Sequence, residues 1–361
     1  MQTLDVDDVD DVDDVDGLEG GTRGGAGPDL LADPGWVVPP VPEDVPEGTM
    51  AWLRARVARF SSGEAHARRR ALAVGALGAL GALDGPDAHA EALRDAARIR
   101  TQELLSAPGT IELMARVARV VPTEVLAASL GLPVTADTAG LVGDVARAYH
   151  AHGEVIPAAD RALARLVADC GGTWDEATAA RIGLLVQAYD ATAGLIGNAA
   201  YLSLTGTGAG ALTGVKALTG AGTGAGTGVG AGTETGAGTG VGAGTEAEAG
   251  HAPEPPPAPS ADLATDRLHQ ALRTDPPVRG TLRAPVDGGD PVRVRLVTSD
   301  GSLAFGAGAH ACPGQAQARA LAAGVLDALL AGGCRLVRPE DIAYEPSVNL
   351  RVPAALEVTC A

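Results

Sequence analysis

The chain has 361 residues, of which 46% are hydrophobic but only 2% aromatic, and its formal net charge is -18. This length allows one large domain or two modest ones, with a core built mainly from Ala, Leu and Val. The acidic balance argues against a nucleic acid partner, because phosphate binding requires clustered Lys and Arg. An acidic N-terminus argues against a signal peptide, and no unbroken run of about 20 apolar residues predicts a membrane span.

Residues 1–45 are predicted to form a disordered tail that is first acidic and then Pro-rich. The Asp-Val repeat from Asp5 to Asp16 repels itself and cannot bury a face. A calcium-binding loop is the alternative. However, Val12 and Val15 interrupt the alternating oxygen ligands that such a loop needs before its glycine. A solvated acidic tail is therefore the prediction.

Helical patterns dominate the next part of the chain, residues 46–204. Helices are predicted over 50–60, 88–105, 110–130 with a break at Pro122, and from the stretch 173–176 to about 204. The spacing of Thr173 and Glu176 is that of a capping box at the start of the last helix. Because this helix is long and apolar on most faces, we expect it in the middle of a large domain.

The stretch 205–260 has low complexity, first Gly/Thr/Ala-rich and then Pro-rich, which predicts a flexible insert or linker. It is not a phosphate-binding loop, because Lys216 is followed by Ala217 rather than Ser or Thr. Structure is predicted to resume in residues 261–361. The expected elements there are helices over 262–273 and 316–330, a short strand over 292–297 and a closing hairpin over 342–358.

The four cysteines are widely spaced and contain no Cys-x-x-Cys pair. They are Cys170, Cys312, Cys334 and Cys360. This usage fits a reducing cytoplasm better than a disulfide framework, so we expect a cytoplasmic protein.

One cysteine stands in a glycine-rich turn just before a predicted helix. Backbone N–H groups of the turn and of the helix N-terminus favour the thiolate of Cys312, which suits an axial ligand of haem iron. A buried structural cysteine is the alternative. The spacing of Phe305, Gly308, His310, Cys312 and Gly314 resembles the cysteine-ligand loop of the cytochrome P-450 family.

The resemblance extends to other stretches. His66 and Arg70 share one face of a predicted helix and resemble the family pair that binds a haem propionate; a basic solvated face is the alternative. Arg283 matches a family arginine that reaches a propionate. Gln270 and Arg273 fall where the family has Glu-x-x-Arg. Gln270 can accept a hydrogen bond from Arg273, but the charge-assisted pair is lost.

The predicted long helix resembles the family's central helix, where an acidic residue and a threonine lie over the haem. Thr192 occupies the threonine position, whereas Ala191 stands at the acidic position and Asp190 is displaced by one residue. Tyr189 replaces a small residue and would crowd the oxygen site or redirect the backbone. The alternative for Thr192 is a hydroxyl that bonds back to the carbonyl four residues earlier.

The resemblance implies a mainly α cytochrome P-450 fold with a small β component. The stretch 273–312 is much shorter than in the family, which predicts loss of the strand pair and meander that brace the ligand loop. The implied cofactor is haem b with the Cys312 thiolate as axial ligand. The implied haem-contacting residues are His66, Arg70, Arg283, Phe305, His310 and Gly314, the histidines and arginines binding propionates.

The resemblance also implies an activity. Thr192 and Asp190 would be catalytic residues of a monooxygenase that hydroxylates a small apolar substrate. The electrons would come from a ferredoxin or a reductase. The degenerate central-helix and Glu-x-x-Arg motifs leave a second hypothesis, a non-catalytic homologue that acts as an auxiliary partner of another biosynthetic enzyme.

Overall fold

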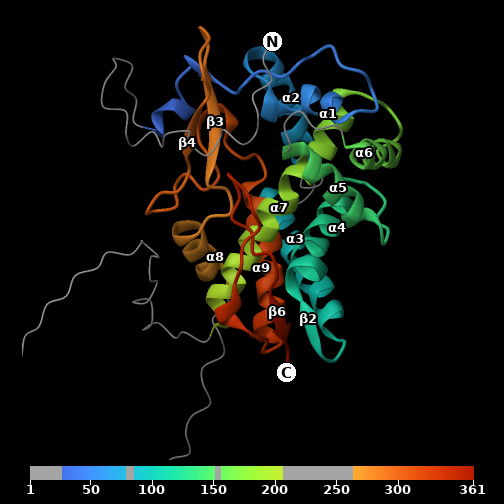
Figure 1. The fold of residues 1–361 in the computed structure, drawn as a ribbon. Coiled ribbons are helices and arrows are strands. Elements are labelled where there is room, and N and C mark those ends of the chain that lie inside the picture. The colour runs from blue at the N-terminus through green and yellow to red at the C-terminus, as the bar shows by residue number, and fades with distance from the viewer. Residues whose placement is uncertain (1–26, 79–84, 151–155, 206–262) are drawn as a thin grey trace, which may run out of the picture. The chain divides into compact units, whose positions relative to one another are not determined.

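A computed structural model describes residues 27–78, 85–150, 156–205 and 263–361 (Figure 1). The predicted insert, apart from its first residue, and the first 26 residues of the predicted tail lie outside this part of the chain. The described elements, in chain order, are η3 (Asp29–Leu31), β1 (Trp36–Val37), α1 (Met50–Arg56), η4 (Ala58–Phe60), α2 (Gly63–Gly78), α3 (Gly85–Leu105), β2 (Thr110–Glu112), η5 (Met114–Ala118), α4 (Val120–Ser129), α5 (Thr138–His150), α6 (Pro157–Asp169), α7 (Glu176–Leu204), α8 (Leu263–Thr274), β3 (Gly280–Pro285), β4 (Val292–Arg295), η6 (Gly308–His310), α9 (Gln315–Ala331), β5 (Arg335–Leu336), η7 (Pro339–Asp341) and β6 (Glu357–Thr359).

The predicted central helix is α7, which has 29 residues. The carboxylate of Asp175 accepts a hydrogen bond from the Thr178 backbone N–H at 2.7 Å, so Asp175 is the N-cap residue. The capping box predicted at Thr173 is wrong, and the helix begins two residues later than that box implies, although it ends at Leu204 as expected. α7 contacts α2, α5, α8 and α9, and Figure 1 shows it crossing the middle of the helices beside α9. Most of its second half is buried, which explains why it is apolar on most faces.

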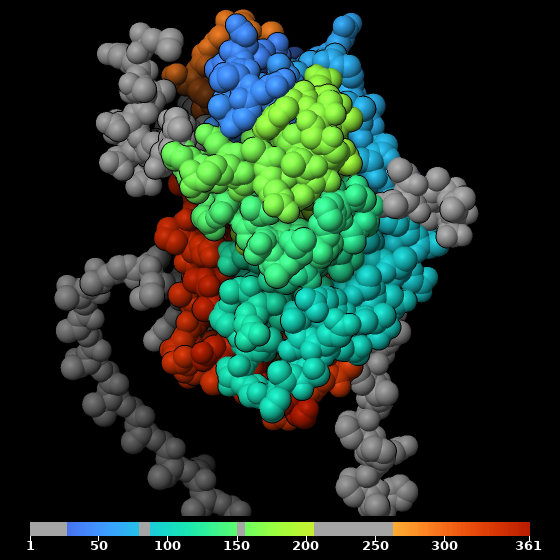
Figure 2. Space-filling model, turned by 90° about the vertical axis from the view of Figure 1, so that its right-hand side faces the viewer, coloured from blue at the N-terminus to red at the C-terminus, as the bar shows by residue number. Residues whose placement is uncertain are grey.

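The helices predicted over 88–105, 262–273 and 316–330 are confirmed with small shifts at their ends, and that over 50–60 is α1 followed by the turn η4. The single helix predicted over 110–130 is wrong in its first part, which forms the strand β2 and the turn η5 before α4. The predicted break at Pro122 is wrong in position, because this proline lies in the first turn of α4. A proline is tolerated there, since the first backbone N–H groups of a helix have no intrahelical partner. The irregularity lies just before it, where η5 forms a π-helical turn. Figure 2 shows the face that carries α4, α5 and α6, bordered along one edge by C-terminal residues.

Two small antiparallel sheets accompany the helices. One has the strand order β1-β3-β4, and the other has the order β2-β6-β5. In the first sheet, Gly280 pairs with Arg295, and Trp36 pairs with Pro285. The predicted loss of the strand pair before the ligand loop is therefore wrong for β3 and β4. Between Arg295 and Gly308 the described backbone contains neither helix nor strand, in keeping with the predicted shortening.

Part of the predicted tail is structured. Leu30 and Leu31 of η3 are buried against Val294, Leu296 and Leu303 in a small second core. The prediction of a disordered tail is therefore wrong for the described residues 27–45. Two adjacent leucines among Gly, Pro and Asp supply enough apolar surface to dock this segment on the sheet and the loop that follows it.

The cysteines also differ from the prediction. Cys334 and Cys360 form a disulfide, with Cα atoms 3.9 Å apart, which joins the residue before β5 to the residue after β6. Cys170 and Cys312 are free. The disulfide could not be predicted from the sequence, because its cysteines are 26 residues apart and only the pairing of β5 with β6 brings them together. Within the described residues, no helix has the length and apolarity needed to cross a membrane.

Candidate functional site

A cavity of about 780 Å³ lies between α2, α7, β3 and the loop 305–314. Its walls include every predicted site residue except Asp190. Those present are His66, Arg70, Thr192, Arg283, Phe305, His310, Cys312 and Gly314. The volume is within the range of sites for small molecules and cofactors.

The loop before α9 is held by its own backbone. The Cys312 N–H donates to the Phe305 carbonyl at 2.8 Å, and the Gly306 N–H donates to the Leu303 carbonyl at 2.7 Å. Gly308 has φ +66°, and a Cβ there would lie 2.3 Å from the Leu31 carbonyl oxygen. The glycine is thus required both by the left-handed backbone conformation and by the close approach of the segment carrying η3.

Cys312 faces the cavity from the end of this loop, and Gly314 is the N-cap residue of α9. Burial raises the pKa of the Cys312 thiol, while a hydrogen bond from the Gly314 backbone N–H and the charge of Arg70 lower it. The side chain is exposed all the same. A cysteine that lines the cavity, with a backbone donor beside its sulfur, is suited to bind a metal.

Imidazole and guanidinium groups gather beside the cysteine. The rings of His66 and His310 have centroids 4.0 Å apart. Arg70 Nη1 donates to the Ala311 carbonyl at 2.7 Å, which ties α2 to the ligand loop. Arg283 is 3% exposed and donates to the hydroxyl of Thr281 at 3.2 Å. Two histidines and two arginines, from α2, β3 and the loop 305–314, therefore lie together at the cavity.

The electrostatics of this cluster indicate a missing anion. Burial, followed by the charges of His66, Arg283, Arg70 and Arg59, lowers the pKa of His310 to about 3. Burial also lowers the pKa of His66. Nε2 of His66 is buried without a hydrogen-bond partner among the described residues. No Asp or Glu of this part of the chain lines the cavity, so the cluster lacks a counter-charge.

The residues fit haem. A thiol in the cavity can ligate the iron, and the cations with the unpaired His66 nitrogen suit two propionate groups. The remaining walls are mostly apolar, as a porphyrin face requires. They include Val57, Leu77, Leu126, Leu184, Leu195, Leu296 and Leu321.

Thr192 and Asp190 of α7 have separate surroundings. Thr192 is 2% exposed and lines the cavity, and its hydroxyl makes no hydrogen bond with any residue that the structure describes. The back-bonded alternative is thus not seen. Asp190 instead pairs with Arg119, at 3.2 Å from Nε. Tyr189 lies away from the cavity, where its hydroxyl would be 2.6 Å from a Cβ at Gly143, so the predicted crowding of the oxygen site is wrong.

The Glu-x-x-Arg position also differs from the prediction. Gln270 accepts a hydrogen bond from Arg267 at 2.8 Å, not from Arg273, whose side chain is exposed. Arg267 lies one turn of α8 before Gln270, and such local pairs form readily on a helix surface.

Four cavity arginines were missed by sequence reasoning: Arg54, Arg59, Arg69 and Arg293. None belongs to a motif. Arg69 is adjacent to the predicted Arg70, so the run Arg68–Arg70 was the one signal that could have identified it.

Comparison of the sequence with protein-family models and with curated proteins gives no match. The fold does match solved structures. Cytochrome P-450 BioI, in complex with an acyl carrier protein ligated with hexadec-9Z-enoic acid, is 17% identical with a TM-score of 0.63, over 92% of this chain and 89% of that one. The cytochrome P-450 CxnD for C–S bond formation in chuangxinmycin biosynthesis is 15% identical with a TM-score of 0.59, over 92% and 85%. A cytochrome P-450 from Chondromyces apiculatus is 16% identical with a TM-score of 0.55, over 84% and 79%.

Proposed function

We propose that this chain, which has the cytochrome P-450 fold, is a haem-thiolate monooxygenase that hydroxylates a small apolar substrate. The net reaction converts R–H, O₂, two electrons and two protons to R–OH and water, with the electrons delivered by a ferredoxin or a reductase. The observation that carries the proposal is the cavity in which the Cys312 thiol meets the buried Arg283 and the half-buried Arg70, neither of which has a carboxylate partner among the described residues.

The proposed roles follow from the cavity walls. Cys312 Sγ would ligate the haem iron, and the Gly314 N–H would stabilise its negative charge. Arg70 and Arg283 neutralise the two propionates, while His66 and His310 donate hydrogen bonds to them. When bound, haem supplies the activation of oxygen, which a thiolate ligand favours by donating electron density to the iron.

The remaining roles concern the ligand loop and α7. Phe305 packs in the wall beside Cys312, and the guanidinium of Arg319 lies 5.1 Å from the centre of its ring. The Thr192 hydroxyl, free of protein hydrogen bonds, holds and passes protons inside the cavity. We do not assign this role to Asp190, because Arg119 holds its carboxylate in an ion pair.

A second function is favoured by one observation. The exposed Arg273 makes no hydrogen bond with Gln270, so the brace that the family pattern would supply at this position is absent. A haem-free or haem-binding auxiliary partner of another biosynthetic enzyme could dispense with that brace.

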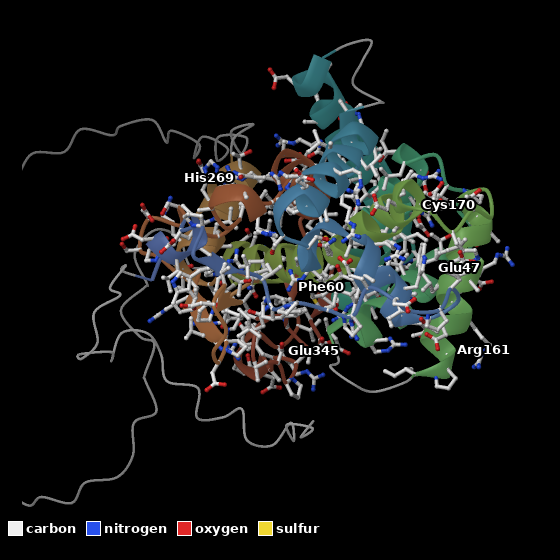
Figure 3. The ribbon with its side chains drawn as sticks, turned by 90° about the horizontal axis from the view of Figure 1, so that it is seen from above. Glu47, Phe60, Arg161, Cys170, His269 and Glu345 are labelled. Atoms are coloured by element: carbon white, nitrogen blue, oxygen red, sulfur yellow. A yellow bond between two sulfur atoms is a disulfide. The ribbon has the colours of Figure 1, made fainter. Side chains whose placement is uncertain are left out.

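The absorbance spectrum of the purified, reduced protein under carbon monoxide tests the proposal. We expect a strongly red-shifted Soret band, which Cys312→Ser abolishes. Cys170→Ser is the matched control and keeps the band, because Cys170 lies at the periphery and not in the cavity wall (Figure 3). Failure of the wild-type chain to take up haem would refute the monooxygenase proposal and leave the auxiliary function.

A further inference from the structure

The cavity carries more positive charge than haem can neutralise. Its described walls contain six arginines and no acidic residue: Arg54, Arg59, Arg69, Arg70, Arg283 and Arg293. Under the proposed function, the two propionates match Arg70 and Arg283 in number. The question is what compensates the other four.

Three of these four are engaged by the protein itself. Arg69 pairs with the carboxylate of Glu176 at 2.8 Å. Arg54 donates to the Tyr149 carbonyl at the end of α5, where a cation is favourable. Arg293 donates to the Val348 carbonyl and so holds the C-terminal segment against β4.

Arg59 is the exception. It lies half-buried in the turn η4, and it makes no hydrogen bond or ion pair with any residue in the described ranges. The nearest described ring is Phe60, whose centroid lies 5.7 Å from the Arg59 guanidinium carbon. A partly desolvated guanidinium without a counter-charge is costly, so an anion in the cavity would be stabilised there.

The surroundings of Arg59 define the rest of the ligand. The ring of Phe60 lies 5.2 Å from that of Tyr149 at an interplanar angle of 50°, and Val57 and Leu184 continue the apolar wall. Figure 3 shows Phe60 toward the middle of the view, whereas Cys170 lies at one side. A molecule that fits this wall has an apolar body and a charged end.

We propose that the substrate is a small apolar acid whose carboxylate is bound by Arg59, a conclusion that rests on the proposed function for the assignment of Arg70 and Arg283 to the propionates. One unpaired guanidinium favours one negative charge, and its planar fork matches a carboxylate bidentately. A phosphate dianion would need a second cation, and the arginine whose charge acts on Arg59, Arg283, is assigned to a propionate.

Calorimetry with the full-length, haem-loaded protein tests the inference. The probes are 4-phenylbutanoate and its uncharged amide, 4-phenylbutanamide. We expect the acid to bind at least about 10-fold more tightly than the amide, because a hydrogen bond to a charged group contributes about 1.5–3 kcal/mol. Arg59→Gln should remove this preference, and Arg59→Lys should retain part of it. Circular dichroism checks that each variant is folded.

Arg116→Gln is the matched control. Arg116 is also an arginine without a hydrogen bond or ion pair among the described residues, but it is exposed and does not line the cavity. Its substitution removes the same charge and should leave both affinities unchanged. Equal binding of acid and amide, a preference that survives Arg59→Gln, or no detectable binding of the acid would each overturn the inference. Dependence of acid binding on Arg70 instead of Arg59 would also overturn it.

Haem content, measured by absorbance on the same preparation, separates this test from that of the proposed function. A chain without haem refutes the monooxygenase proposal. Equal binding of acid and amide by protein with full haem content overturns the Arg59 inference alone, because haem uptake has then been demonstrated on the same preparation.

Discussion

Arg119 Nε lies 3.2 Å from Asp190 Oδ1, and Nη2 of the same guanidinium lies 2.7 Å from Glu345 Oε1. This arginine therefore joins the turn before α4, the middle of α7 and the C-terminal segment. Arg119 and Asp190 are 14% and 17% exposed, so the pair is largely desolvated. Thr192, two residues further along α7, faces the cavity instead, because two helical positions are about 200° apart.

Asp190→Asn should therefore lower stability and leave haem binding intact. Losing one charge of a largely buried pair leaves Arg119 with only the more exposed Glu345, and we expect a loss of about 1–3 kcal/mol in the free energy of unfolding. Urea unfolding measures the loss. The control is Asp144→Asn, whose partner Arg147 is highly exposed, and it should change the value by less than about 0.5 kcal/mol.

Thr192→Ala should instead change the reaction and leave the stability of the fold nearly unchanged. If the hydroxyl passes protons inside the cavity, its loss should divert electrons from product to hydrogen peroxide by about 10-fold or more, with little change in unfolding free energy. The ratio of peroxide to NAD(P)H consumed in a reconstituted reaction measures this. Thr178→Ala is the matched control and should leave the ratio unchanged, because Thr178 is buried on the same helix but outside the cavity wall. An unchanged ratio in Thr192→Ala would refute the proton-delivery role.

Local patterns explain which parts of the site could be predicted. The spacing of Phe305, Gly308, His310 and Cys312 encodes a loop closed by its own backbone bonds, and the structure brings the distant His66 to it. The direction of Asp190 could not be predicted in the same way. It depends on Arg119 and Glu345, which the sequence separates widely from α7 and only the fold brings together.

The same reasoning explains the errors in the fold. β3 contains a glycine, a proline and an arginine, so it lacks a clear alternating pattern, and only its partner β4 was predicted. The segment with Leu30 and Leu31 was assigned to the tail because its composition is dominated by neighbours rich in Gly, Pro and Asp. Arg59 belongs to no motif, and its importance follows only from the absence of acidic groups around the cavity.

Gly308→Ala tests how this N-terminal segment braces the ligand loop. The new Cβ would be 2.3 Å from the Leu31 carbonyl oxygen, and a backbone atom cannot move aside as a flexible side chain can. We expect a loss of haem and a destabilisation of more than about 2 kcal/mol, since strain at positive φ alone costs about 1–2 kcal/mol.

Gly131→Ala isolates the strain. Gly131 has φ +76°, but a Cβ there meets nothing within 4 Å. This control should lose only the stability that the strain at positive φ costs, and it should keep its haem. If the two variants lose the same stability and haem content, the contact between Leu31 and the loop does not brace the site.

The stability of the chain should depend on pH through Glu176 at the start of α7. Its carboxylate accepts from Arg68 Nε at 2.7 Å and from Arg69 Nε at 2.8 Å, and Arg69 is itself buried. The hydrogen bond from Arg68 is the largest cause, and that from Arg69 a further cause, of a pKa lowered to about 2. Because this pKa is lower in the folded than in the unfolded chain, the stabilisation is complete above the unfolded pKa of about 4.3 and is lost as pH falls toward 2. Glu176→Gln should thus be less stable than wild type by about 1–3 kcal/mol at pH 7, and the difference should shrink between pH 4.3 and 2.

Urea unfolding of both proteins at pH 7, 5 and 3 measures this difference. Glu103→Gln serves as the control, because Glu103 forms an exposed pair with Arg100 on α3. We expect it to differ from wild type by less than about 0.5 kcal/mol at each pH, since such pairs contribute little in water. A deficit of Glu176→Gln that stayed constant from pH 7 to 3 would mean that the variant acts through packing at the α2–α7 contact and not through the charge of Glu176.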